Sequence, residues 1–349
     1  MKDINSGSIS MFETLAAEAR KISIVTHMKP DGDAMGSSMA MYHFLKSAGK
    51  SPKVILNDPY PAYLSFLVSG EASEDICIFA DNPEKASEEI TGSDLIICLD
   101  FNAFHRTDRL AKPLAEARGK KVLIDHHLNP AGELFDLSFS ETETSSASEL
   151  LYHILMATER IADDARKLGR ECMEALLTGM TTDTNNFANS VYPSTLRMAS
   201  SLLEAGTDRD AILNRLYNQF SENRLRMMGH MMKDLLTITP DGVAYIVLDR
   251  KTMNQYDIAE GDTEGFVNMP LSIAQVRMSI LIKEDEERVR VSIRSKKGTS
   301  ANMCAKRFFN GGGHENAAGG RLYIPADIKG IEEAGDYIER NTHIYLNNE

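Results

Sequence analysis

The chain has 349 residues, of which 42% are hydrophobic and 26% are charged, proportions that are ordinary for a soluble globular protein. This length suits two domains, each with its own core. The net charge of −13 argues against a surface that coats nucleic acid non-specifically, but it leaves room for a local basic groove.

Targeting signals and cysteine usage point to the cytoplasm. The first ten residues are polar and do not form a signal peptide, and no apolar run approaches the roughly 18 residues of a membrane span. The four cysteines (77, 98, 172 and 304) are scattered, without a Cys-x-x-Cys pair. Cys98 lies inside an apolar strand pattern, which favours a buried thiol in a reduced setting.

The first half of the chain alternates strand-like and helix-like segments. The predicted strands are residues 22–26, 53–57, 95–99 and 121–124, and the predicted helices are residues 12–20, 34–48, 145–157 and 170–180. Short continuous apolar strands between helices indicate an α/β domain with a mainly parallel sheet that helices cover on both faces. We expect this domain to occupy residues 1–190.

The second half has a different pattern. Apolar residues recur at helical spacing from Pro193 to Leu236, which predicts a helical connector over residues 191–236. A smaller α+β domain is expected over residues 237–349. Its predicted strands are residues 243–248, 277–283 and 288–294, and its predicted helices are residues 300–309 and 328–340. We expect the active site in the cleft between the two domains.

Carboxylates and imidazoles gather in four segments, three of them directly after predicted strands. These residues are His27, Asp31 and Asp33; Asp100; Asp125, His126 and His127; and Asp183. In open α/β sheets ligands bind at the carboxyl ends of the strands. Taken singly, each segment is explained as well by a turn, a helix cap or a surface pair. Taken together, they favour a metal site, because such groups crowd together only when cations hold them.

The mixture of ligands bears on the metal. Histidine with aspartate suits Mn²⁺, Fe²⁺, Co²⁺ or Zn²⁺, whereas Mg²⁺ prefers oxygen alone. We expect two divalent ions and rank Mn²⁺ first, because the set is rich in carboxylates and has no thiolate. Two metals about 3.5–4 Å apart can activate one water and clamp a phosphoryl group. Asp100 is the expected bridging carboxylate, since it would lie between the two flanking loops.

The same motifs resemble those of a known family. His27-x-x-x-Asp31-x-Asp33, Leu99-Asp100, Asp125-His126-His127 and Thr182-Asp183-Thr184 occur in the order of the DHH phosphoesterase superfamily. The resemblance implies a two-metal phosphoesterase. It implies that His27, Asp31 and Asp100 hold one metal and that Asp33, Asp100, His126 and Asp183 hold the other. By the same resemblance His127 would contact the substrate phosphate or the leaving oxygen, and Asp125 would orient its neighbours.

A basic strip lies in the second domain. The window from Arg288 to Arg321 has eight Lys or Arg residues and a single acid, Glu315. Period-2 geometry puts Arg288, Arg290 and Arg294 on one face of a strand. Arginine suits phosphate groups, and Arg294 is the one predicted to bind substrate, although a solvated strand face explains a single arginine equally well.

The glycine-rich segment that follows strengthens the resemblance. Gly311-Gly312-Gly313-His314, with Ala317-Ala318-Gly319 after it, matches the DHH-associated domain of the first type. In relatives that domain binds nucleotide or single-stranded nucleic acid. The resemblance therefore implies that Gly311, Gly312, Gly313 and His314 contact the substrate.

Members of the family with this length and layout hydrolyse short oligoribonucleotides (nanoRNA) and dephosphorylate 3′-phosphoadenosine 5′-phosphate (pAp). The resemblance implies that activity here, with short single-stranded RNA or a nucleotide as the partner and no membrane. Two alternatives remain open: a soluble cyclic-di-AMP/pApA phosphodiesterase, and a non-catalytic nucleic-acid-binding module of the same fold. The resemblance also allows a homodimer, although no patch in the sequence indicates one.

Overall fold

The computed structural model describes residues 4–68, 70–219, 221–258, 261–285 and 289–347. The chain divides into two compact units, residues 1–219 and 220–349. The division falls inside the segment 191–236, where the sequence predicts a helical connector. Within the described ranges, no helix is both long enough and apolar enough to cross a bilayer.

The first unit is built on a parallel sheet. Its helices and strands are α1 (Ser6–Glu18), β1 (Ile22–Thr26), α2 (Gly32–Ser47), β2 (Lys53–Leu56), β3 (Ile76–Ile78), α3 (Pro83–Thr91), β4 (Leu95–Leu99), α4 (Ala111–Glu116), β5 (Lys120–Asp125), β6 (Leu137–Ser140), α5 (Ala147–Met156), α6 (Arg170–Asp183), α7 (Pro193–Glu204) and α8 (Arg209–Tyr217). Among the described residues the sheet has six strands in the order β3-β2-β1-β4-β5-β6. Each neighbouring pair is parallel, which confirms the expected α/β sheet.

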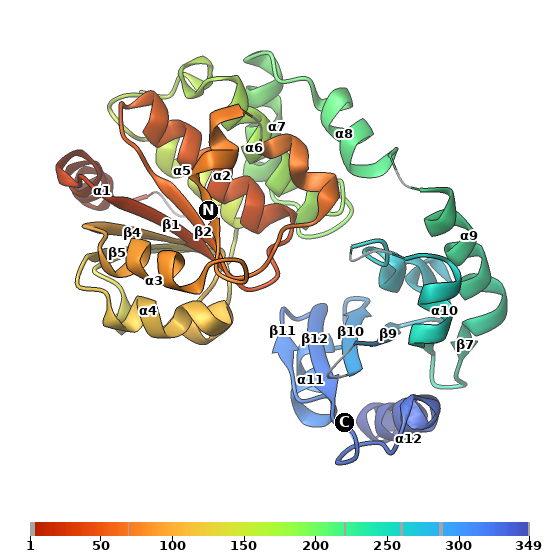
Figure 1. Ribbon diagram of the computed structural model, residues 1–349. Helices are drawn as coiled ribbons and strands as arrows, with labels where there is room; N and C mark the ends of the chain where they lie inside the picture. The colour runs from red at the N-terminus through yellow and green to blue at the C-terminus, as the bar shows by residue number, and fades with distance from the viewer. Residues whose placement is uncertain (1–3, 69, 220, 259–260, 286–288, 348–349) are drawn as a thin grey trace. The chain divides into compact units, whose positions relative to one another are not determined.

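Helices cover both faces of this sheet (Figure 1). The larger apolar core joins the sheet to α1, α2, α5 and α6, and the smaller one joins the opposite face to α3 and α4. The central strands β1 and β4 are buried along their whole length, as expected for strands covered on both sides. Cys98 is fully buried within β4, as predicted.

Helix α2 begins earlier than predicted. The composition of residues 27–33 predicts a turn, with the helix beginning at Ala34, but α2 begins at Gly32. The cause is Asp31, which is the N-cap residue and accepts the backbone N–H groups of Asp33 and Ala34, both at 3.1 Å. Asp33 therefore projects from the first turn of a helix, which fixes its backbone more firmly than a loop would.

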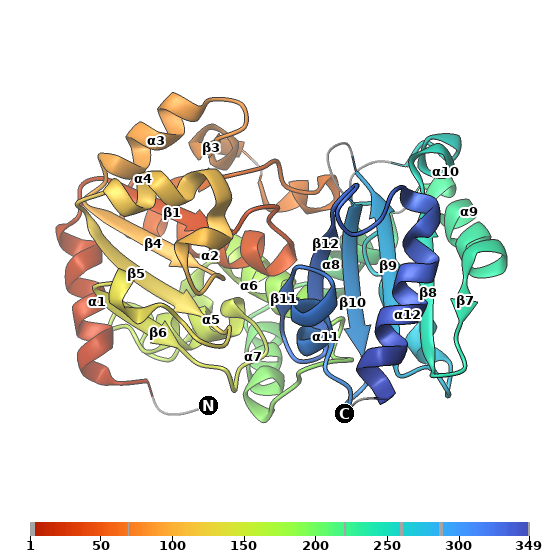
Figure 2. The same cartoon turned by 90° about the horizontal axis from the view of Figure 1, so that it is seen from below.

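The second unit contains a mixed sheet. Its elements are α9 (Glu222–His230), a π-helical turn (Met231–Leu235), β7 (Thr237–Ile238), β8 (Val243–Leu248), α10 (Arg250–Gln255), β9 (Met278–Glu284), β10 (Val289–Ser295), α11 (Ala301–Phe308), β11 (Gly312–Gly313), β12 (Ala317–Leu322) and α12 (Ala334–Asn347). Among the described residues the order is β11-β12-β10-β9-β8-β7. Only β8 and β9 pair in parallel within that part of the chain. Figure 2 shows β8, β9, β10 and β12 side by side.

The alternation predicted for β10 is confirmed where the structure describes it. Val289, Val291 and Ile293 are buried in the core formed with α11 and α12, whereas Arg290 and Arg294 are half-buried on the other face. Arg288 lies outside the described residues. The last helix differs from the prediction of residues 328–340, because α12 runs from Ala334 to Asn347.

Candidate metal centre

The site residues of the first unit meet at one edge of the sheet. Strands β1, β4 and β5 are neighbours and parallel, so their carboxyl ends lie together. His27 follows β1, Asp100 follows β4, and Asp125 ends β5. Asp183 arrives from elsewhere, as the last residue of α6. All four segments singled out in the sequence are therefore brought to one place.

Asp100 lies at the middle of this cluster. It is 3% exposed, and its φ of 61° is unusual for a residue with a side chain. Its Oδ2 is 3.5 Å from His27 Nε2, while its Oδ1 is 3.4 Å from His126 Nε2. The two oxygens of one carboxylate thus face two different groups of donors.

His27 and Asp31 belong to the first group. His27 Nδ1 donates to the carbonyl oxygen of Met28 at 2.8 Å, which leaves Nε2 without a proton in the neutral ring. That Nε2 lies 3.8 Å from Asp31 Oδ1. One ligand atom from each of His27, Asp31 and Asp100 falls within 4.8 Å of the others, which is the spacing that a single ion requires.

Asp33 and His126 form the second group with Asp100, and Asp183 lies beside His126. His126 Nε2 is 3.9 Å from Asp33 Oδ2 and 3.6 Å from Asp183 Oδ2. Ligand atoms of Asp33, Asp100 and His126 also lie within 4.8 Å of one another. His126 and Asp33 are buried, whereas the side chain of Asp183 is 30% exposed.

The amino end of α5 holds Asp33 in place. The backbone N–H of Ala147 donates to Asp33 Oδ2 at 2.6 Å, and that of Ser148 donates to Asp33 Oδ1 at 2.9 Å. These are the first two N–H groups of α5, which have no acceptor inside their own helix, and the positive end of the helix dipole favours a carboxylate. The sequence does not predict this contact. The Ser145-Ser146 pair indicates the start of a helix. The local sequence does not show which group accepts hydrogen bonds from the first N–H groups of that helix.

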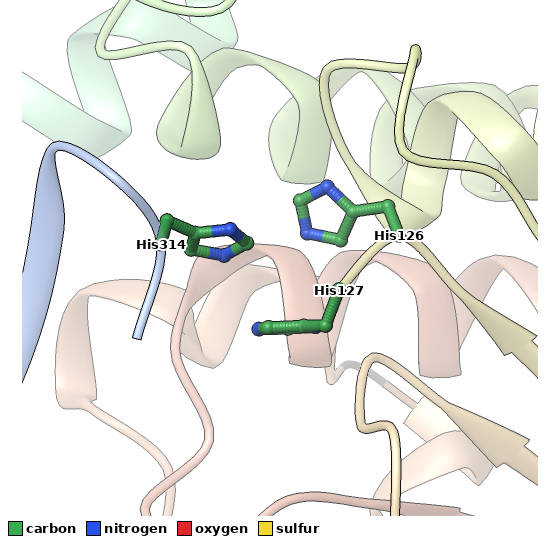
Figure 3. Close-up of side chains that lie close together, drawn as sticks. All are labelled: His126, His127 and His314. Carbon is green, nitrogen blue, oxygen red and sulfur yellow. The ribbon is translucent and has the colours of Figure 1, made fainter. Parts of the chain in front are cut away.

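His127 and Asp125 form a separate pair beside Asp100. Asp125 is fully buried, and its Oδ1 lies 2.7 Å from His127 Nδ1. A carboxylate only accepts hydrogen bonds, so Nδ1 carries the proton. Figure 3 shows the rings of His126 and His127 projecting from the same loop, with centroids 4.9 Å apart and planes inclined by 69°.

The charges of the cluster shift its protonation equilibria. Burial disfavours the charged imidazole of His126, but contact with Asp100 and the charges of Asp183 and Asp33 outweigh burial and raise its pKa to about 10. Burial, together with the charges of Asp100 and Asp183, raises the pKa of Asp33 well above its usual value. Protons thus offset the carboxylate charge of the metal-free chain, and metal binding must displace them.

The donor set fits divalent ions. Asp100 Oδ1 is buried and has no hydrogen-bond partner among the described residues, which would be costly for a carboxylate oxygen unless a cation completed its surroundings. Mixed imidazole and carboxylate donors without a nearby thiolate suit Mn²⁺, Fe²⁺ or Co²⁺ better than they suit a structural Zn²⁺ ion.

A network of hydrogen bonds that supports the β1–α2 loop was also not predicted. Asp58, which follows β2, accepts the backbone N–H of Lys29 at 2.8 Å, and Lys29 has a φ of 52°. Arg109 donates to Asp58 Oδ1 at 3.3 Å and to the carbonyl oxygen of Asn57 at 3.0 Å. The signal was present in the sequence, because Asn57 and Asp58 follow an apolar strand, as His27 and Asp100 do.

The predicted substrate residues of the second unit occupy a tight hairpin. A Cβ on Gly311 would lie 1.9 Å from the carbonyl oxygen of Gly319, so close backbone packing explains that glycine. The N–H groups of Gly311, Gly313 and His314 donate to Ala305 O, Asn302 Oδ1 and Ala317 O, respectively. These three amides are engaged within the unit, so the loop's role as an anion site stays a prediction.

Arg294 lies on β10, opposite Ser279 of β9 and Ala317 of β12. One guanidinium nitrogen donates to the carbonyl oxygen of Ile293 at 3.0 Å. The side chain is half-buried on the face that carries Arg290. Its contact with substrate likewise stays a prediction.

Comparison with known proteins gives consistent matches over nearly the whole chain. The model of the DHH family N-terminal domain matches residues 21–180, and that of the DHHA1 domain matches residues 240–339. The bifunctional oligoribonuclease and PAP phosphatase NrnA of Thermus thermophilus is 33% identical over 92% of this chain and 88% of its own length. The Bacillus subtilis protein of the same name is 25% identical over 90% of this chain and 91% of its own length.

A solved structure matches equally well. The crystal structure of an exopolyphosphatase-related protein from Bacteroides fragilis superposes with a TM-score of 0.89 at 37% identity. The superposition covers 99% of this chain and 98% of that one.

Proposed function

The chain belongs to the DHH family of metal-dependent phosphoesterases, and we propose that it hydrolyses short oligoribonucleotides, dephosphorylates pAp, or does both. The similarity to NrnA proteins over about nine-tenths of each chain carries the proposal. The donor cluster around Asp100 supports it, because each of the metal-binding positions expected from the sequence motifs has an oxygen or nitrogen donor there.

The proposed ligands divide between two divalent ions, with Mn²⁺ as the first candidate. His27, Asp31 and Asp100 Oδ2 would hold one ion. Asp33, Asp100 Oδ1, His126 and Asp183 would hold the other, and the distances from Asp100 to the two imidazoles support this division. Such ions would supply charge neutralisation at the phosphoryl oxygens and acidify a water molecule.

His127 is the proposed proton carrier. Its Nδ1–H is held by Asp125, so Nε2 is the atom that would exchange a proton with the leaving oxygen. Asp125 would fix the tautomer and stabilise the imidazolium form of His127, which gives up its Nε2 proton and becomes neutral. Hydrolysis joins a water oxygen to phosphorus and breaks the bond between phosphorus and the leaving oxygen, and that oxygen takes up the proton as it departs.

Residues of the second unit are proposed to bind the rest of the substrate. Arg294 would pair with a phosphate, since a guanidinium offers parallel donors to such a group. Gly311, Gly312, Gly313 and His314 would contact the nucleotide. The half-buried arginines of β10 support an anionic ligand, in a chain that is otherwise acidic.

Product analysis by chromatography tests the substrate assignment. The full chain with Mn²⁺ would be incubated separately with pAp, with a pyrimidine diribonucleotide and with cyclic-di-AMP, beside the Asp100→Asn variant. The proposal expects mononucleotides from the diribonucleotide, AMP from pAp, or both, and no products from the variant. Turnover of cyclic-di-AMP alone would overturn it in favour of a cyclic-dinucleotide phosphodiesterase.

A further inference from the structure

Three consecutive residues that follow the C-cap of α6, Thr184, adopt left-handed backbone conformations. Asn185, Asn186 and Phe187 have φ values of 47°, 56° and 66°. Residues with a side chain rarely adopt this region, and a bulky aromatic residue there is an outlier. Such conformations persist only where surrounding contacts enforce them, and they cluster at functional sites. Asp183 lies two residues before this run.

The end of the helix explains the first of the three. Asn186 N donates to Thr181 O at 2.8 Å, and Asn185 N donates to Thr182 O at 3.0 Å. This is the hydrogen-bond pattern of a Schellman motif, whose C′ residue is left-handed and is usually Gly and sometimes Asn. The motif needs only Asn185 in that conformation, so Asn186 and Phe187 require further contacts. One is the hydrogen bond from the Phe187 N–H to Thr184 Oγ1 at 3.0 Å.

Arg209, on α8, supplies contacts to both remaining residues. Its Nη2 donates to Asn186 Oδ1 at 2.6 Å, and its guanidinium carbon lies 5.5 Å from the centroid of the Phe187 ring. Phe187 also packs against the main core. One arginine thus engages the side chains of two successive strained residues, by a hydrogen bond and by a cation–π contact.

Asp183 lies at the end of the helix that leads into this turn. It is the last residue of α6, and the ends of helices fray. Its side chain is 30% exposed and lies 3.6 Å from His126 Nε2, so packing restrains it less than the buried site residues. A change in the backbone of residues 185–187 would therefore move its carboxylate.

We propose that Arg209 is a positioning residue, which holds the left-handed turn 185–187 and thereby fixes Asp183 for binding one of the two metal ions. The inference rests on the proposed function, because it takes Asp183 as a ligand. It extends the site to a side chain on α8 that belongs to none of the sequence motifs.

The inference is tested by titrating the full chain with Mn²⁺ and measuring binding by calorimetry and by electron paramagnetic resonance. Arg209→Ala should lower the affinity for one of the two ions by about 10- to 100-fold, the range typical of residues that orient ligands. The other ion should bind as in the wild type. Adding Asn186→Gly should restore most of the lost affinity, because glycine adopts positive φ without strain.

Two reference variants define the outcome. Arg215→Ala is the matched control, since Arg215 also lies on α8 and contacts a different ring, that of Phe66, at 5.0 Å; it should leave both affinities unchanged. Asp183→Asn sets the largest effect that Arg209→Ala can have on the affected ion.

Three results would overturn the inference. Wild-type affinities in Arg209→Ala would show that the turn holds without the arginine. Equal loss of both ions with no rescue by glycine would show a general loss of structure. A wild-type chain that binds no Mn²⁺ would remove the proposed function itself, which is distinguishable because the wild type, and not the variant, then fails.

Discussion

Asp125 contacts His127 twice within one tripeptide: its Oδ1 lies 2.7 Å from His127 Nδ1, and its Oδ2 accepts the His127 backbone N–H at 3.1 Å. The double contact fixes both the tautomer and the orientation of the ring. Asp125 itself is fully buried, so it acts on a substrate only through His127.

Asp125→Asn should lower kcat by about 10- to 100-fold while two Mn²⁺ ions still bind. An amide can present its NH₂ group to Nδ1 and stabilise the wrong tautomer. Steady-state kinetics and metal stoichiometry check this. Asp136→Asn is the control, because Asp136 pairs with Lys120 at 2.7 Å at the start of β5, away from the site. Loss of metal together with activity would assign Asp125 to ion binding instead.

Asp100→Asn should lower the affinity for each of the two ions by more than about 100-fold. This loss exceeds that typical of residues that only orient ligands. The reason is that each oxygen of Asp100 faces a different histidine. Asp31→Asn is the comparison, since Asp31 lies only in the group with His27, and it should weaken one ion. Isothermal titration with Mn²⁺ measures both. Loss of a single ion in Asp100→Asn would contradict the bridging assignment.

Gly179→Ala should destabilise the first unit by about 1–3 kcal/mol. A Cβ at this position would lie 2.0 Å from Ser148 Oγ and 2.8 Å from Asp33 Oδ1, so the buried contact of α6 with α5 must open. Differential scanning calorimetry measures the shift. A Cβ added at Gly229, in α9, would have no neighbour within 4 Å. Gly229→Ala should therefore raise the stability by up to about 1 kcal/mol. An unchanged unfolding temperature in Gly179→Ala would show that this packing is loose.

Much of the site could be predicted because strands 22–26 and 95–99 are short, predominantly apolar runs. Once they are placed in a parallel sheet, the residues that follow them must share one edge. The motif order added the expected division of ligands, which stays a prediction, although ligand atoms of His27, Asp31 and Asp100, and those of Asp33, Asp100 and His126, come together in the structure. The bounds of strand 243–248 were predicted for the same reason, since a uniform apolar run leaves little choice of ends.

The remaining contacts are set by tertiary structure. Asp33 is held by two amides more than a hundred residues away, and no local pattern encodes a helix end that caps a remote carboxylate. The short strands β3 and β6 went unpredicted because three or four residues give too little periodicity. Arg209 could not be singled out, since its value depends on backbone conformations that sequence does not reveal.

Stability should depend on pH through Glu149. This side chain is fully buried, and its Oε2 accepts from Ser145 Oγ at 2.5 Å and from Thr195 Oγ1 at 2.6 Å. Burial disfavours its charge, but these bonds and the contact with His153 outweigh burial and lower the pKa from 4.5 to about 2. The lowered pKa corresponds to about 3 kcal/mol of stability.

The sign follows from the direction of the shift. The folded-state pKa of Glu149 lies below the unfolded value, so this stabilisation is fully present above pH 4.5 and is lost as pH falls toward 2. Glu149→Gln should therefore destabilise the protein at pH 7 and differ less from the wild type near pH 3. Urea unfolding at both pH values measures the difference, with the exposed Glu143→Gln as control. If the difference in unfolding free energy between the wild type and Glu149→Gln is as large at pH 3 as at pH 7, the ionised Glu149 does not stabilise the fold.

Anomalous scattering from crystals of the full chain soaked in Mn²⁺ would show whether two ions share the Asp100 carboxylate. We predict two manganese peaks, one on each side of this carboxylate. One peak should lie within ligand distance of His27 and Asp31, and the other within ligand distance of Asp33, His126 and Asp183. The absence of manganese at Asp100, or a single ion with the remaining side chains turned away, would contradict this prediction.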